Sequence, residues 1–166
     1  MFEMRVATAA DCAAVFRLCN TAYHAESGDT PPAFKKTTRF LLTAEILPNI
    51  EARRVLLCTS GAQTLGCLSY TLEGGVEGAP LRAHFGPFAV LPEAQGRGVG
   101  SALLGELARV ARAAGCVSLD AEVVNHRHDI FCMYFALGFR VVGEGAFPAP
   151  ERCTRACHFV CIRRAL

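Results

Sequence analysis

The sequence predicts a mixed α/β fold built from a single domain of 166 residues. Strand-like segments alternate along the chain with segments that have the 3.6-residue period of helices. The length suits one domain, and 52% hydrophobic residues can fill a substantial core. Neither a repeat nor a linker divides the sequence. We therefore assign residues 1–166 to one domain, with a central sheet of six to seven strands flanked by about four helices.

The chain is expected to begin with a strand and a capped helix. Residues 3–7 have strand character. Thr8 can cap the next helix, and Asp11 stands where a capping-box acid reaches back to the cap. This helix extends to about Tyr23 and places four apolar residues on one face, namely Val15, Leu18, Cys19 and Ala22.

The next segments are expected to form a loop, a short helix and two strands. Residues 24–38 are polar and contain two prolines, which predicts a loop. Residues 39–47 predict a short helix that ends at Pro48. Two strands separated by a glycine turn follow at 54–59 and 64–72.

The second half of the chain is expected to alternate strands and helices. Residues 82–90 predict a strand in which Pro87 marks a bulge or an unpaired position. The helix at 98–114 ends at Gly115. The remaining elements are a strand at 117–124, a helix at 129–137, and strands at 139–143 and 155–164.

Composition and charge exclude several classes of protein. A net charge of +2 is too small to indicate a nucleic-acid surface. No apolar run approaches the ~20 residues that span a bilayer, and the first residues lead us to expect no signal peptide. The nine cysteines are odd in number, and most lie inside apolar runs, which favours a reducing compartment. We expect a cytoplasmic protein that binds neither nucleic acid nor a membrane.

Three glycines at alternate positions, Gly96, Gly98 and Gly100, join the strand at 82–90 to the next helix. This arrangement predicts an anion site, because the first helical N–H groups lack partners and glycine lets an anion approach the backbone. The loop does not match the dinucleotide fingerprint, because the third glycine is missing. It does not match the P-loop either, because the lysine is missing. The loop is therefore expected to bind a phosphate or pyrophosphate of another kind of ligand. The alternative is a purely structural glycine turn.

The loop sequence at 95–100, QGRGVG, resembles the pyrophosphate loop of the GCN5-related N-acetyltransferase (GNAT) superfamily, Q/R-x-x-G-x-G/A. The resemblance extends over nearly the whole chain. Tyr134, followed by Gly138 and Phe139, resembles the second signature of the family at the expected separation from the loop. The resemblance implies a GNAT-like fold in which the fourth and fifth strands splay apart.

The resemblance also implies that acetyl-CoA is the cosubstrate and lies in the gap between these strands. One departure from the family is that Asn125 lies nine residues before Tyr134, while Arg127 holds the position of the usual asparagine. The residues that match cofactor-binding positions are Phe88, Ala89, Val90, Gln95, Gly96, Arg97, Gly98, Val99, Gly100, Ser101 and Asn125.

The implied reaction is direct attack of a primary amine on the acetyl thioester in a ternary complex. It requires a base, an oxyanion donor and an acid for the departing thiolate. Tyr134 matches the acid of the family, and the backbone N–H of Val90 matches the donor. Tyrosines, with an ordinary pKa near ~10, stay protonated at neutral pH. Core packing beside Phe131 and Phe135 is the alternative for Tyr134.

The sequence leaves the identity of the base open. His84 stands where histone-acetylating members of the family place a glutamate. Histidines with an ordinary pKa of ~6.5 accept protons at neutral pH. Glu122 is the second candidate, and either side chain can instead be a structural residue of its strand. Glu26 and Asp29 could contact the incoming amine, and a water chain would also serve as the proton acceptor.

We therefore expect an acetyl-CoA-dependent N-acetyltransferase whose partner is a small-molecule or peptide amine; a homodimer is left open. The alternative is a non-catalytic module of the same fold that binds CoA or acyl-CoA. A zinc-stabilised domain is a third class, suggested by Cys153, Cys157, His158 and Cys161. These residues lack a second ligand pair, so no metal is expected. Cys132 is expected to pack in the core of its helix.

Overall fold

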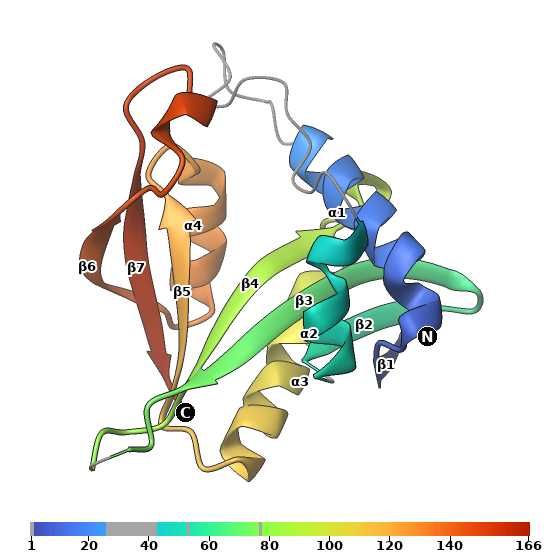
Figure 1. The fold of residues 1–166 in the computed structure, drawn as a ribbon, viewed down its shortest axis with the longest axis horizontal. Helices are drawn as coiled ribbons and strands as arrows, with labels where there is room; N and C mark the ends of the chain where they lie inside the picture. Colours follow the sequence, from blue (N-terminus) through green and yellow to red (C-terminus); the bar gives the residue numbers. More distant parts are fainter. Residues whose placement is uncertain (1, 26–42, 53, 77) are drawn as a thin grey trace.

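The computed structural model describes residues 2–25, 43–52, 54–76 and 78–166. They form a seven-stranded sheet in the order β1-β2-β3-β4-β5-β7-β6 (Figure 1). The strands are β1 (Glu3–Val6), β2 (Val55–Ser60), β3 (Gln63–Glu73), β4 (Arg82–Val90), β5 (Ser118–Val124), β6 (Arg140–Ala146) and β7 (His158–Ala165). The prediction of an α/β fold with a mixed sheet is confirmed.

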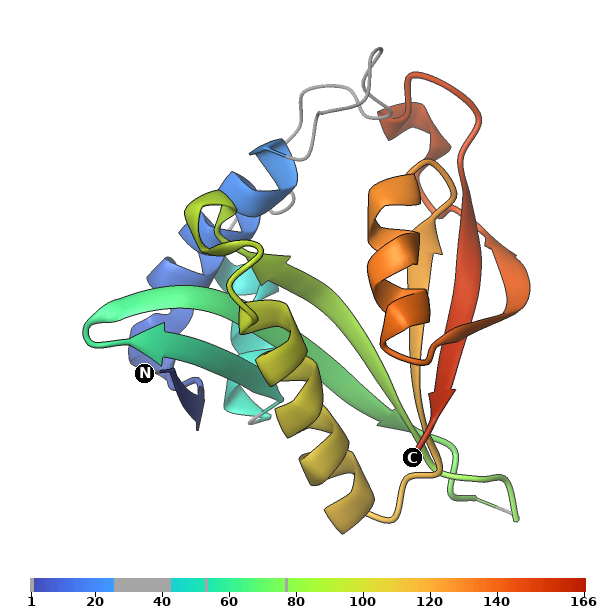
Figure 2. The ribbon, with the colours of Figure 1, turned by 180° about the vertical axis from the view of Figure 1, so that it is seen from behind.

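Helices cover both faces of the sheet. Figures 1 and 2 show α1 and α2 on one face, called here the α1 face, and α3 and α4 on the other, called the α3 face. The helices are α1 (Cys12–Ala25), α2 (Leu47–Glu51), α3 (Val99–Ala113) and α4 (His128–Ala136). Among the described residues, no helix combines the length and the apolar character needed to cross a membrane.

The first four residues of β2, residues 55–58, are all apolar and buried. Leu56 and Cys58 belong to the apolar cluster beneath α3, whereas Val55 and Leu57 belong to the cluster beneath α1. Successive residues of a strand point to opposite faces, so a strand covered on both sides needs apolar residues on both faces.

The predicted inner face of α1 is confirmed, because its four residues Val15, Leu18, Cys19 and Ala22 are buried.

The parallel pairing of β4 with β5 is short. It joins only three residue pairs, from Arg82 opposite Ser118 to His84 opposite Asp120. Strand β5 then continues along β7 as far as Val124. Beyond His84 and Asp120 the strands β4 and β5 separate, as Figure 1 shows, and the predicted splay is confirmed.

The prediction that a helix at 39–47 ends at Pro48 is wrong. Residues 39–42 lie outside the described part of the chain. Thr43–Glu45 form a short 3₁₀ turn, and α2 begins at Leu47 with Pro48 in its first turn. Proline fits there because the N–H that it lacks would have no acceptor within the helix. This proline therefore starts a helix instead of ending one.

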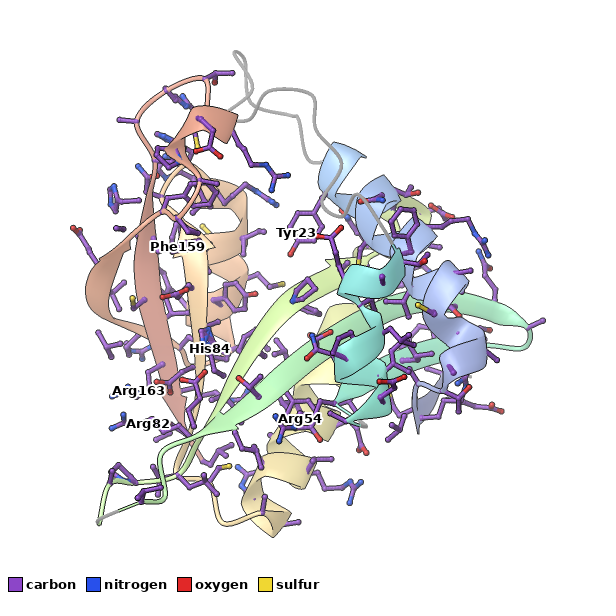
Figure 3. The ribbon with its side chains drawn as sticks, in the orientation of Figure 1. Tyr23, Arg54, Arg82, His84, Phe159 and Arg163 are labelled. Atoms are coloured by element: carbon purple, nitrogen blue, oxygen red, sulfur yellow. The ribbon has the colours of Figure 1, made fainter. Side chains whose placement is uncertain are left out.

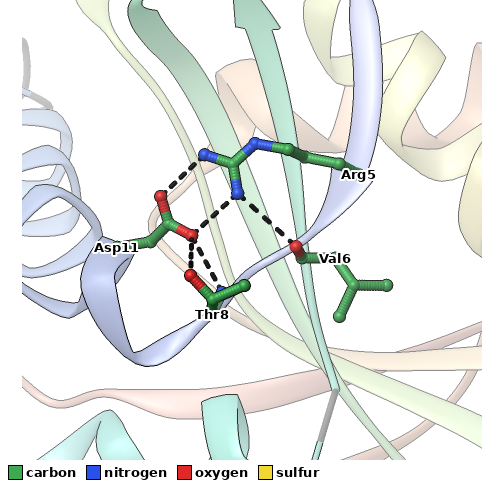
Figure 4. A network of polar contacts seen from close by, with 4 residues as sticks. All are labelled: Arg5, Val6, Thr8 and Asp11. Carbon is green, nitrogen blue, oxygen red and sulfur yellow. Dashed lines mark hydrogen bonds and ion pairs between the residues drawn. The ribbon is translucent and has the colours of Figure 1, made fainter.

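A polar network of Arg5, Thr8 and Asp11 ties β1 to the start of α1 (Figure 4). Asp11 Oδ2 accepts the Thr8 N–H at 2.8 Å and the Thr8 hydroxyl at 3.0 Å. The Arg5 guanidinium donates to both carboxylate oxygens, at 2.6 and 2.7 Å. These bonds, first of all those from Arg5, hold the pKa of Asp11 well below its ordinary value. The predicted capping role of Asp11 is confirmed.

We predict that Asp11→Asn lowers the free energy of unfolding by about 1–2 kcal/mol at pH 7. Because the carboxyl pKa is lower in the folded state, its contribution is complete above the unfolded value of ~3.9 and is lost as pH falls below it. Urea unfolding should therefore show a smaller difference between mutant and wild type at pH 3 than at pH 7. Glu3→Gln, on the exposed side of β1, is the control. A difference that does not depend on pH would contradict this explanation.

Candidate active site

Past the splay, residues 88–90 of β4 pair with β3 on one side only. The Leu91 N–H donates to the Leu65 carbonyl on β3 at 2.9 Å. Backbone groups of successive residues point to opposite edges of a strand, so those of Val90 and Phe88 point away from β3 and into the gap beside β5. These backbone groups therefore lack a strand partner on the β5 side, where an extended ligand can pair with them.

A bulge in β4 lies where the two strands separate. Phe85 is opposite Tyr70 and Phe88 is opposite Leu68, so two residues of β4 face a single residue of β3. An extra residue of this kind bends the strand that carries it. The prediction of a bulge at Pro87 is confirmed.

The glycine loop has the form of an anion site. Gly96 and Gly98 have φ angles of 71° and 85°, which residues with a side chain rarely adopt. Gly98 is the N-cap of α3, and its carbonyl accepts the Ala102 N–H at 3.0 Å. The N–H groups of residues 99–101 precede that bond and have no acceptor within the helix. Arg97 is exposed beside them.

Gly100 allows close contact between α3 and the sheet. A Cβ at this position would lie 3.2 Å from Phe88 Cζ. On β3, a Cβ at Gly66 would lie 2.9 Å from Val99 Cγ1. These glycines bring the first turn of α3 against the strands that border the gap. This packing role of Gly66 was not predicted from the sequence, although a glycine inside a strand can indicate the close approach of another segment.

Tyr134 projects from α4 into the cluster on the α3 face, and it is 5% exposed. Its ring centroid lies 5.3 Å from that of Phe139 and 6.1 Å from that of Phe85. Phe131 and Phe135, the neighbours expected from the sequence, instead pair with each other at 6.0 Å. Phe85 of β4 and Phe139, the residue before β6, thus fix the position of the Tyr134 ring.

Both candidate bases lie on the opposite side of the sheet from Tyr134. On β4, His84 stands between Ala83 and Phe85, which are buried in the cluster on the α3 face. Alternation therefore directs His84 to the α1 face. On β5, Glu122 alternates with buried residues of the same cluster, namely Leu119, Ala121 and Val123. The plane of the sheet therefore separates the two candidate bases from the candidate acid.

His84 has a neighbour that the sequence did not reveal. Its Nδ1 lies 3.7 Å from Oε1 of Glu73, and its side chain is 29% exposed. This contact follows from the pairing of β3 with β4, which sets Thr71 opposite His84. Glu122 is exposed, and its Oε1 lies 3.7 Å from the position of a Cβ at Gly145 on β6.

Asn125 joins the ends of two strands. Its Oδ1 accepts the His158 N–H at 3.2 Å, and its own N–H donates to the His158 carbonyl at 3.0 Å. The side chain thus holds the start of β7 against the end of β5, while Arg127 is the N-cap of α4. Glu26 and Asp29 lie outside the described residues.

The cysteines near the C-terminus do not gather around a metal site in the described part of the chain, where no three metal-binding side chains cluster. Burial and the neighbouring Cys153 raise the pKa of Cys157 to about 11. A raised pKa disfavours the thiolate form that binds zinc. Cys132 is exposed on α4, so the prediction that it packs in the core is wrong.

Comparisons with known proteins agree with this geometry. Residues 19–139 match the Acetyltransferase (GNAT) family, and the chain belongs to that family. The prediction of an N-acetyltransferase is therefore confirmed at the level of the enzyme class. No curated protein gives a significant match to the sequence.

Solved structures support the fold. The ribosomal-protein-alanine N-acetyltransferase of Brucella melitensis matches with a TM-score of 0.76 and 22% identity, over 99% of each chain. Salmonella typhimurium yncA, solved with acetyl-CoA, matches at 0.75 and 24% identity, over 100% of this chain and 94% of that one. The Thermoplasma acidophilum PaiA N-acetyltransferase, solved with coenzyme A, matches at 0.77 and 13% identity, over 100% and 99%.

Proposed function

We propose that the protein transfers the acetyl group of acetyl-CoA to a primary amine of a small molecule or peptide, in a ternary complex. The observation that carries the proposal is the gap between β4 and β5, which has the glycine loop beyond one end and candidate proton-transfer groups on both faces. Family membership supports acetyl-CoA as the cosubstrate. Two structural neighbours, solved with acetyl-CoA and with coenzyme A, also support it.

The backbone of β4 and its loop would hold the cosubstrate. The pantetheine arm would pair with Phe88 and Val90 as an added strand does. The pyrophosphate would accept N–H groups of residues 96–101, with Arg97 available as an exposed cation. Gln95 Nε2 donates to the Val90 carbonyl at 3.3 Å and thereby holds the loop against the end of β4.

The two faces of the sheet would divide the proton transfers. Acetyl-CoA supplies the activated thioester when it is bound. The Val90 N–H would donate to the carbonyl oxygen, where negative charge develops. The Tyr134 hydroxyl, on the α3 face, would protonate the departing thiolate, and His84 or Glu122 would accept the amine proton on the α1 face. The amine would then enter from the α1 face.

A screen of amines with acetyl-CoA, read by release of the free thiol, tests the proposal. Calorimetry should first show that CoA and acetyl-CoA bind more tightly than NAD or ATP. Tight binding without transfer to any amine would favour the non-catalytic CoA-binding module. Equal binding of all four ligands would show that the loop is not a CoA site.

We predict that Gly98→Asp abolishes CoA binding, measured by calorimetry. An aspartate there combines an unfavourable left-handed φ with a negative charge at the helix N-terminus. Gly105→Asp is the matched control, because it adds the same charge to α3 at an exposed position with open space around the Cβ. Unchanged affinity in a folded Gly98→Asp protein would remove the loop from the site.

We predict that Tyr134→Phe lowers kcat by roughly 10²-fold, the low end of the range for a general acid, while acetyl-CoA binding changes little. The phenylalanine keeps the ring contacts with Phe85 and Phe139. Tyr70→Phe is the control, because it removes a hydroxyl from a second tyrosine of the same cluster. If Tyr134→Phe turns over normally, the residue only packs.

We predict that the pH profile identifies the base. The logarithm of kcat/KM should rise with pH through one ionisation in the wild type, because the base must be deprotonated. If His84 is the base, His84→Gln loses this rise and Glu122→Gln keeps it; the reverse pattern identifies Glu122. A rise that persists in both variants would exclude both residues and indicate a water-relayed base or the amine itself.

A further inference from the structure

Charged and polar side chains of neighbouring strands lie side by side on the α1 face of the sheet, where β4 and β5 are still paired. In register, Thr71 and Glu73 of β3 lie opposite His84 and Arg82 of β4, and His84 lies opposite Asp120 of β5. Figure 3 shows Arg82, His84 and Arg163 close together on this part of the sheet. His84 therefore has a carboxylate on the strand at each side.

Asp120, the carboxylate on the β5 side, is already engaged. Arg163 donates to both of its oxygens, at 2.6 and 3.0 Å, and the Ser118 hydroxyl donates at 2.6 Å. Burial opposes the charge of Asp120, but these bonds outweigh it and lower the pKa of this carboxyl. Asp120 thus forms a bidentate ion pair and has little capacity left to orient an imidazole.

Glu73, the carboxylate on the β3 side, forms no bidentate pair with an arginine of the described residues. Its Oε1 accepts the Thr71 hydroxyl at 3.1 Å and lies 3.7 Å from His84 Nδ1. Arg82 is the cross-strand neighbour of Glu73, and Glu122 lies further along β5, past the splay. Thr71 thus holds one Glu73 oxygen beside the imidazole.

We propose that Glu73 is a positioning residue for His84; the proposal rests on the proposed function, in which His84 accepts the proton of the amine. A carboxylate beside Nδ1 favours the tautomer that carries its proton on Nδ1. Nε2 then keeps its lone pair and accepts the proton. Thr71 supports the arrangement by fixing the carboxylate.

Side-chain ¹⁵N NMR of the histidines, at a pH where they are neutral, tests the tautomer without any substrate. His84 should carry its proton on Nδ1 in the wild type and shift toward the Nε2–H form in Glu73→Ala. Glu73→Gln, which keeps an acceptor oxygen, should largely preserve the wild-type form. Glu144→Ala is the matched control, because Glu144 Oε1 lies 3.8 Å from His158 Nε2 in a similarly exposed pair.

Kinetics supplies the second measurement. Glu73→Ala should lower kcat/KM for the amine roughly tenfold, a small part of the ~10²–10⁴-fold contribution of a general base, and leave KM for acetyl-CoA unchanged. In a His84→Gln background the same change should have no further effect.

An unchanged His84 tautomer in Glu73→Ala, or an unchanged rate, would overturn the proposal. A fully active His84→Gln protein would refute the proton-accepting role in the proposed function. The NMR measurement is independent of that result.

Discussion

The early end of the pairing between β4 and β5 is the constraint on which the rest of the structure depends. Backbone groups that lose a strand partner need another partner or water. The bulge at Pro87 bends β4 away, while β5 keeps its full length by pairing with β7. Asp120, which is in the last residue pair between β4 and β5, forms an ion pair with Arg163 on β7. The opening is therefore built into an otherwise continuous sheet.

In the proposed reaction, this opening makes both faces of the sheet available to the reactants. In a continuous sheet, groups on opposite faces would be separated by hydrogen-bonded backbone. Here, Tyr134 lies on the α3 face, and His84 lies on the α1 face at the last residue pair that joins β4 to β5. Gly66 and Gly100 let the start of α3 approach the same strand. Strand alternation thus places the backbone donors of β4, the glycine loop and the candidate acid and bases around one gap.

Features that depend on neighbouring residues could be predicted from the sequence, and features that depend on strand register could not. The Asp11 cap, the bulge at Pro87 and the start of a helix near residue 98 each follow from chemistry within a few residues. The contact between Glu73 and His84 requires the register of β3 with β4, which no local pattern specifies. The prediction that a helix ends at Pro48 was wrong because proline suits the first turn of a helix as well as the residue after its end.

The carboxylates of this molecule differ in their hydrogen-bond partners, and the difference separates those that stabilise the fold from the one that we propose orients His84. Asp11 and Asp120 each receive a bidentate arginine and a hydroxyl, which fixes their charge and joins two segments of the fold. Among the described residues, Glu73 accepts a hydrogen bond from one hydroxyl, and its side chain is 62% exposed. Exposed pairs of this kind contribute only about 0–1 kcal/mol to stability. Stability therefore explains the arginine forks but not the placement of Glu73 beside His84, whereas orientation of the imidazole does.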